Sequence, residues 1–79
     1  MINPDQIRTW IESGLRCERV EVTGDGRHFE AVIVSPDFRG KSRVQRHQLV
    51  YSALGSRMES AIHALSMQTF TPEEWAVQG

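Results

Sequence analysis

Two apolar runs separated by a stretch of helical periodicity most constrain what this chain can fold into. The first run is His28–Val34 and the second is about Ile62–Phe70, and each has the length of a strand. If the stretch between them is a helical crossover, the two strands are parallel and begin at the same end of a sheet. We therefore predict that the first residues of both strands meet there.

The N-terminal segment predicts a helix. Asn3, Pro4 and Gln6 are typical of a helix start, because Asn caps free amides, Pro suits the first turn and Gln can reach back to the cap. Gly14 is the expected end of this helix. Its apolar stripe at helical spacing consists of Ile7, Trp10, Ile11 and Leu15.

A hairpin is predicted after this helix. Arg19–Thr23 alternates polar and apolar residues, and the turn residues Gly24–Gly26 separate it from the run that begins at His28. Pro36 is expected to end the second strand, within the connector Ser35–Gly40. The first two strands should therefore be antiparallel neighbours.

The pattern from Lys41 to about Met58 is helical. At 100° per residue its apolar residues fall within an arc of roughly 120°, and Gly55 favours a break into two helices. The arc contains Val44, Val50, Tyr51, Leu54 and Met58. After the third strand, Thr71–Glu74 is a strong N-terminal cap for a short helix that contains Trp75.

The resulting order is α-β-β-α-α-β-α. It predicts an α+β fold with a three-stranded mixed sheet and, in the simplest arrangement, with all helices on one face. The chain has 79 residues, of which 39% are hydrophobic and 24% charged, so it has room for one small core. We predict a single domain over residues 1–79.

The composition argues against several classes of protein. A net charge of −1 does not favour a protein that coats nucleic acid. The single cysteine, Cys17, cannot form an internal disulfide or a cysteine-based zinc site, which suits a reducing cytosol. No signal stretch or membrane-length segment is present, so we expect a cytoplasmic protein without membrane contact. No nucleophile turn, phosphate loop or His-Glu-x-x-His pair is found, so we do not expect an enzyme.

His28 and His63 are the candidate metal ligands, since each stands at the start of an expected strand. Neighbouring strands lie about 4.8 Å apart, close enough for two imidazoles to bind the same ion. The competing interpretation is structural, with His28 an exposed hairpin residue and His63 a half-buried residue bonded to backbone. Two imidazoles leave a metal unsaturated, so further ligands must come from a partner. Binding should weaken below about pH 6, as imidazoles become protonated.

A basic segment is the second candidate site. Residues 38–58 contain five basic residues and no acidic one. The residues that could dock on phosphates are Arg39, Lys41, Arg43 and Arg46. A solvated or protein-docking face explains the same pattern and is favoured, because no aromatic stacking platform accompanies it. His47, within the apolar arc, is expected to be a packed, hydrogen-bonded structural residue, and Cys17 a small buried or rim residue.

Three blocks of the sequence resemble one family. They are Phe38–Tyr51, Ile62–Met67 and Thr69–Trp75, and in this order they are similar to the BolA family. The turn Gly24–Phe29 resembles the bacterial IbaG-type branch of that family in particular. The resemblance spans nearly the whole chain and implies a BolA-like fold related to type II KH domains. The Gly-x-x-Gly loop of KH domains is absent, which does not favour RNA binding of the KH type.

The resemblance also implies a function. It points to an adaptor that forms a heterodimer with a monothiol glutaredoxin carrying the Cys-Gly-Phe-Ser motif, and shares with it a glutathione-containing [2Fe–2S] cluster. His63 matches a cluster ligand of the family, and His28 is the residue that can match a second ligand from the loop between the first two strands. The glutaredoxin's cysteine and the thiol of glutathione would complete the site, so no cofactor is expected in the isolated protein.

The implied role is in iron–sulfur cluster trafficking or iron sensing. Histidine ligation in place of thiolate lowers the negative charge of such a cluster and raises its reduction potential. The alternative is a DNA-binding transcriptional regulator that uses the basic helical segment 39–57.

Overall fold

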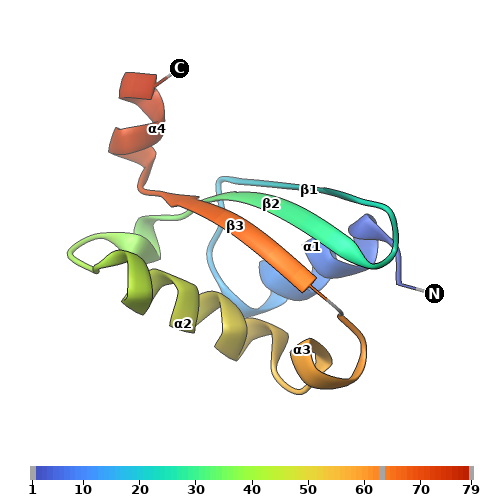
Figure 1. Cartoon of the computed structure of the whole chain (residues 1–79). Helices are drawn as coiled ribbons and strands as arrows, with labels where there is room; N and C mark the ends of the chain where they lie inside the picture. Colours follow the sequence, from blue (N-terminus) through green and yellow to red (C-terminus); the bar gives the residue numbers. More distant parts are fainter. Residues whose placement is uncertain (1, 63, 79) are drawn as a thin grey trace.

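One mixed sheet carries helices on both of its sides (Figure 1). The computed structural model describes residues 2–62 and 64–78. Its elements are α1 (Pro4–Gly14), β1 (Arg19–Gly24), β2 (His28–Val34), η1 (Pro36–Phe38), α2 (Arg43–Leu54), α3 (Arg57–Ser60), β3 (Ala64–Phe70) and α4 (Pro72–Gln78). They follow the predicted order, with the short 3₁₀ turn η1 inside the predicted connector. None of the described helices is both long and apolar enough to cross a membrane.

The sheet has the order β1-β2-β3, with β2 in the centre. β1 is antiparallel to β2, and Arg19 lies opposite Val34. β3 is parallel to β2, so that His28 lies opposite Ala64 and Val34 opposite Phe70. The predicted hairpin and the predicted parallel crossover are therefore confirmed, and β2 and β3 begin at the same end of the sheet.

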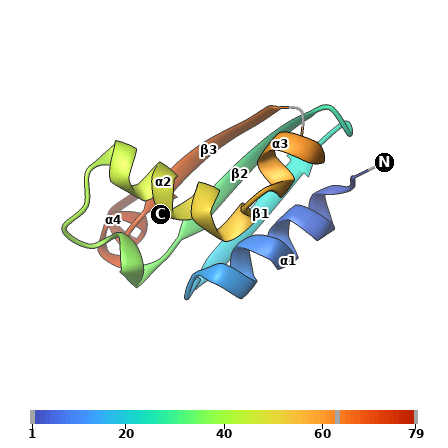
Figure 2. The ribbon, with the colours of Figure 1, turned by 90° about the horizontal axis from the view of Figure 1, so that it is seen from below.

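The core lies between the sheet and the helices α1 and α2 (Figure 2). Phe29, Ala31 and Ile33 alternate along β2 and are all buried, because successive side chains of a strand point to opposite faces. The two helices contribute the fully buried side chains Ile7, Ile11, Val50 and Leu54. The apolar stripe of each helix thus faces the same side of the sheet.

α1 begins with the predicted capping box between Asn3 and Gln6. The Asn3 side chain accepts a hydrogen bond from the Gln6 amide at 2.9 Å, and the Gln6 side chain accepts one from the Asn3 amide at 2.9 Å. The helix ends at Gly14 as expected, but not through a left-handed cap, since Leu15 follows with an extended backbone. Gly14 instead lets α1 approach α2 closely, because a Cβ there would lie 2.5 Å from the Cβ of Ala53.

The predicted break at Gly55 is confirmed, whereas the predicted buried arc is only partly right. Gly55 ends α2 with a φ of +61°, in the region that favours glycine. Val50 and Leu54 are fully buried, but Val44 is 65% exposed and Tyr51 is 42% exposed. At 100° per residue Val44 and Tyr51 lie roughly 60–120° around the helix from the buried pair, beyond the strip that the sheet covers.

α4 lies on the other side of the sheet from α1, α2 and α3, so the expectation of all helices on one face is wrong (Figure 1). Its Trp75 ring makes an edge-to-face contact with Phe70, with the centroids 5.3 Å apart. The guanidinium of Arg19 lies 5.2 Å from the centroid of the Trp75 ring. Only Thr71 separates β3 from α4, so the chain has no length in which to turn back to the face that the other helices cover.

Replacement of Gly14 by alanine is expected to destabilise the protein by about 1–3 kcal/mol, because the added methyl group must push α1 away from Ala53. The free energy of unfolding in urea measures this effect. Ser13→Ala, at an exposed position of the same helix turn, is the control and should change it by less than about 0.5 kcal/mol. Equal stability of the two variants would show that α1 and α2 do not need this close approach.

Candidate functional site

The β1–β2 turn and the starts of β2 and β3 meet at one end of the sheet (Figure 1). His28 is the first residue of β2 and lies opposite Ala64, the first residue of β3. The Ala64 amide donates a hydrogen bond to the Arg27 carbonyl at 3.0 Å, which ties the start of β3 to the turn. His63 lies outside the described residues, so its meeting with His28 stays a prediction.

The β1–β2 turn is held by the side chain of Asp25. Its carboxylate accepts hydrogen bonds from the amides of Arg27 and His28, each at 2.9 Å, while Gly26 adopts a φ of +100°. These amides, that of His28 first, hold the pKa of Asp25 below its ordinary value. From the sequence, Gly24–Gly26 was predicted to be a turn, but the role of Asp25 was not predicted, although Asp is a residue that bonds the backbone two or three residues further on.

His28 stands in an open groove of about 400 Å³. It is lined by Thr23, Gly24, Asp25, His28, Phe29, Glu30, Ala64 and Ser66. The His28 side chain is exposed and can be reached by a partner. Among the described residues no group of three or more His, Cys, Asp or Glu side chains could hold a metal ion. The groove is open, and His28 is the imidazole that lines it.

Cys17 is far from this groove. It precedes β1, whose first residue pairs with the last residue of β2, so about six residues of strand, or roughly 20 Å, separate it from His28. Burial, followed by the charges of Glu12 and Asp37, raises the pKa of the Cys17 thiol to about 11. Such a thiol stays protonated at neutral pH and is a poor metal ligand. The predicted rim position is confirmed, since Cys17 is half-buried beside the core.

Two of the four basic docking candidates already pair with acidic residues of α4. Arg39 bonds Glu73, with an Nη2–Oε2 distance of 2.6 Å. Arg46, whose side chain is 14% exposed, bonds Glu74 with an Nη1–Oε1 distance of 2.7 Å. Arg39 holds the pKa of Glu73 below its ordinary value, and Arg46 with the Thr71 amide lowers that of Glu74 to about 2. Both carboxylates are therefore ionised at neutral pH.

Lys41 and Arg43 differ from these two arginines. Both are exposed, and neither forms an ion pair with any residue in the described ranges. Glu73 and Glu74 were predicted only as part of a helix cap, and their pairing with the basic segment was not predicted. The sequence did contain a signal for this pairing, because residues 38–58 carry five basic residues and no acidic one, and two adjacent acidic residues follow later in the chain.

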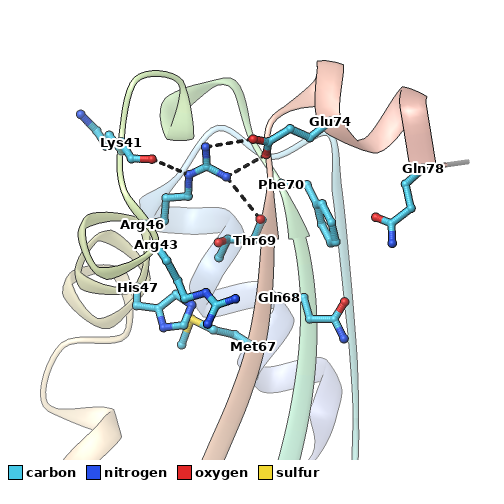
Figure 3. Close-up of a pocket in the computed structure, with 10 residues that line it drawn as sticks. All are labelled: Lys41, Arg43, Arg46, His47, Met67, Gln68, Thr69, Phe70, Glu74 and Gln78. Atoms are coloured by element: carbon cyan, nitrogen blue, oxygen red, sulfur yellow. Dashed lines mark hydrogen bonds and ion pairs between the residues drawn. The ribbon is translucent and has the colours of Figure 1, made fainter.

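A groove with a volume of about 800 Å³ lies between α2, β3 and α4 (Figure 3). It is lined by Lys41, Arg43, Arg46, His47, Met67, Gln68, Thr69, Phe70, Glu74 and Gln78. His47 was predicted to be a packed, hydrogen-bonded residue. It is half-buried in the groove wall, and its ring forms no hydrogen bond with a described residue. The expected bond is missing because His47 sits between the buried strip of α2 and solvent.

A family model for BolA-like proteins matches residues 2–74. The chain is 49% identical over 55 residues to the DNA-binding transcriptional regulator BolA of Haemophilus influenzae, covering 70% of this chain and 53% of that protein. It is 38% identical over 73 residues to the acid stress protein IbaG of Escherichia coli, covering 91% of this chain and 87% of that protein. The chain thus spans about half the length of the first relative and most of the second.

A solved structure gives the same result. A BolA protein homologue from Coxiella burnetii superimposes with a TM-score of 0.89 and 49% identity, covering 96% of this chain and 99% of that one. The protein belongs to the BolA family, and its similarity to IbaG over most of both chains assigns it to the IbaG-like branch. The predicted family and the predicted BolA-like fold are confirmed.

Replacement of Glu74 by glutamine is expected to destabilise the protein at pH 7, because it removes the ionic partner of Arg46. The pKa of Glu74 is lowered from 4.5 to about 2, so its contribution is present above pH 4.5 and is lost as the pH falls through about 2. The difference in urea midpoint between wild type and Glu74→Gln should therefore persist at pH 5 and shrink towards pH 2. Glu59→Gln, at an exposed position on α3, is the control and should show no such pH-dependent difference.

Proposed function

We propose that this protein is a non-enzymatic cytoplasmic adaptor that partners a monothiol glutaredoxin and shares with it a glutathione-containing [2Fe–2S] cluster. His63 and His28 are the ligands contributed by this chain. The cluster is cargo of the heterodimer, which acts in cluster trafficking or iron sensing. When bound, the cluster supplies the reducible iron centre on which either role depends.

The observation that carries the proposal is the parallel register of β2 and β3. It sets His28 opposite Ala64, and His63 precedes Ala64 directly in the sequence. Two residues at the starts of adjacent parallel strands are separated by about one strand spacing, 4.8 Å. Membership of the BolA family is the second support, since the block Ile62–Met67 carries the histidine that matches a family ligand.

The chemistry of the groove supports a shared site. His28 stands in an exposed groove, where Asp25 and the start of β3 hold its backbone. A rigid backbone presents the imidazole without a large loss of conformational entropy on binding. In the proposed complex the remaining ligands are the glutaredoxin cysteine and the thiol of glutathione, as membership of the BolA family implies. The cluster should therefore assemble only in the mixed complex.

The three histidines of this chain provide matched variants for the test. Mixed with a cluster-loaded monothiol glutaredoxin and glutathione, the wild-type protein should change the visible circular dichroism spectrum of the cluster. His63→Ala and His28→Ala should each alter the spectrum of the mixture, because each removes one proposed ligand. His47→Ala, which lies in the α2–β3–α4 groove, is the control and should leave it unchanged. A His63→Ala spectrum identical to wild type would refute the ligand assignment.

The second candidate function is DNA binding. It is supported by the name of the Haemophilus influenzae relative and by the charges of Lys41 and Arg43, which are exposed and form no ion pair with another described residue. The pairing of Arg39 and Arg46 with α4 limits it, because only two of the four candidates are left to contact phosphates.

Duplex DNA binding through Lys41 and Arg43 alone should follow a shallow salt dependence, with a slope of log K against log salt of about −1.8, since each phosphate contact contributes about −0.9. Fluorescence anisotropy of a labelled duplex across a salt series measures this slope. A slope near −3.6 would mean instead that Arg39 and Arg46 leave Glu73 and Glu74 to bind phosphates. Glu73→Gln and Glu74→Gln should then strengthen the binding.

A further inference from the structure

β3 is an edge strand of the sheet, and its outward backbone groups border the groove between α2, β3 and α4. In the sheet order β1-β2-β3, within residues 2–62 and 64–78, it has a neighbouring strand on one side only. The Ala64 amide bonds the Arg27 carbonyl, and the Phe70 carbonyl accepts from the Ser35 amide, so the even-numbered residues of β3 direct their backbone groups towards the β2 side. Because these directions alternate along a strand, Leu65, Met67 and Thr69 direct theirs outward.

One contact confirms this direction. The Thr69 carbonyl accepts a hydrogen bond from Nη1 of Arg46 at 3.4 Å, on the side of β3 that faces away from β2 (Figure 3). The Arg46 side chain thus occupies the Thr69 carbonyl, which is the last backbone acceptor of β3 that points outward. The outward amides and carbonyls before it have no strand to pair with in the described sheet. An unpaired edge of this kind can accept an added strand.

The groove surrounds this edge from both faces of the sheet. In Figure 3, Arg43 and His47 of α2 lie on one side of β3, close to Met67. Gln68 and Phe70 point to the other side, towards Gln78 of α4. A groove that is open along the strand and walled above and below suits a chain in extended conformation.

The positive charges of Lys41 and Arg43 in the groove favour an acidic ligand. Lys41 and Arg43 line it, are exposed and form no ion pair with a described residue. The first turn of α2 contains no acidic residue that would offset them. Arg46, by contrast, is neutralised by Glu74 and serves to hold α4. The local positive charge is notable because the whole chain has a net charge of −1.

The same side of α2 also exposes apolar surface. Val44 and Tyr51 lie within roughly 60° of His47 around the helix at 100° per residue, and His47 lines the groove. Val44 is 65% exposed and Tyr51 42% exposed, the two large apolar residues of α2 that the core does not cover. Alternate side chains of an added strand point to the same face of the sheet, so acidic side chains of the occupant on the α2 face would meet the charges, and an apolar side chain among them would meet this surface.

We propose that an extended acidic segment of a partner protein adds to the free edge of β3 as a fourth strand, with its carboxylates on Lys41 and Arg43. A peptide suits this edge better than a nucleic acid does. The edge alternates amide donors with carbonyl acceptors, and a peptide backbone offers both kinds of group. A phosphate backbone offers acceptors only and would leave the carbonyls of β3 without partners.

This surface is independent of the proposed cluster site. His28 lies opposite the first residue of β3, whereas the last residues of β3, Met67–Phe70, line the groove. An acidic segment that pairs with Met67 and Thr69 leaves the start of β3 to a cluster partner, so both could be bound at the same time. His28→Ala should leave binding of the peptide unchanged, so failure of one proposal does not decide the other.

The probe is a fluorescein-labelled nine-residue peptide of alternating Glu and Val, titrated with the isolated protein at low salt and followed by fluorescence polarisation. Arg43→Glu is expected to weaken binding about tenfold or more, because a charge-assisted contact becomes a repulsion. The variant should fold, since an acid in the first turn of α2 complements the helix dipole. Arg27→Glu makes the same change of charge at the other end of β3 and should weaken binding by less than about twofold.

Backbone pairing is tested with two N-methylated peptides. Only every second amide of an added strand faces its neighbour, so methylation of one alternate set should abolish binding while methylation of the other set is tolerated. Equal tolerance of both sets, or equal weakening by Arg43→Glu and Arg27→Glu, would overturn strand addition in favour of a diffuse ionic attraction. Binding of a 20-base-pair duplex but not of the peptide would also overturn the proposal and assign the groove to nucleic acid.

Discussion

The parallel pairing of β2 with β3 is the constraint on which the rest of the structure depends. Parallel neighbours require a crossover, and here it runs through α2 and α3, which places Val50 and Leu54 over the same sheet face as α1. The pairing also sets the start of β3 beside His28, and no strand of the described part of the chain pairs with the other side of β3. Both surfaces to which we assign a function therefore follow from one register.

The charges are distributed in accordance with this arrangement. α4 leaves the end of β3 after a single residue, and its two first-turn acids bind Arg39 and Arg46. These ion pairs join α4 to Arg39, which follows η1, and to α2, and they neutralise two of the four predicted docking charges. Lys41 and Arg43 are left exposed beside the edge of β3. The effective basic surface is thus smaller than the sequence indicates and lies along one strand.

Features whose signal is local were predictable from the sequence. The cap of α1, the break at Gly55 and the β1–β2 hairpin each depend on residues within a few positions of one another, and all are confirmed. The position of His28 at the start of a strand was predictable for the same reason. The site as a whole was not: the Asp25 hydrogen bonds were missed, and the meeting of His28 with His63 stays a prediction.

The sequence by itself determined the order of the elements, the parallel crossover and the family, because these depend on periodicity, capping residues and blocks of similar residues. Only the tertiary structure decided the side on which α4 lies, the exposure of Val44 and the function of Gly14 as a point of close helix approach. It also decided which basic residues remain unpaired. The physical reason is that burial and ion pairing depend on atoms far apart in the chain, and residue periodicity does not specify which of those atoms meet.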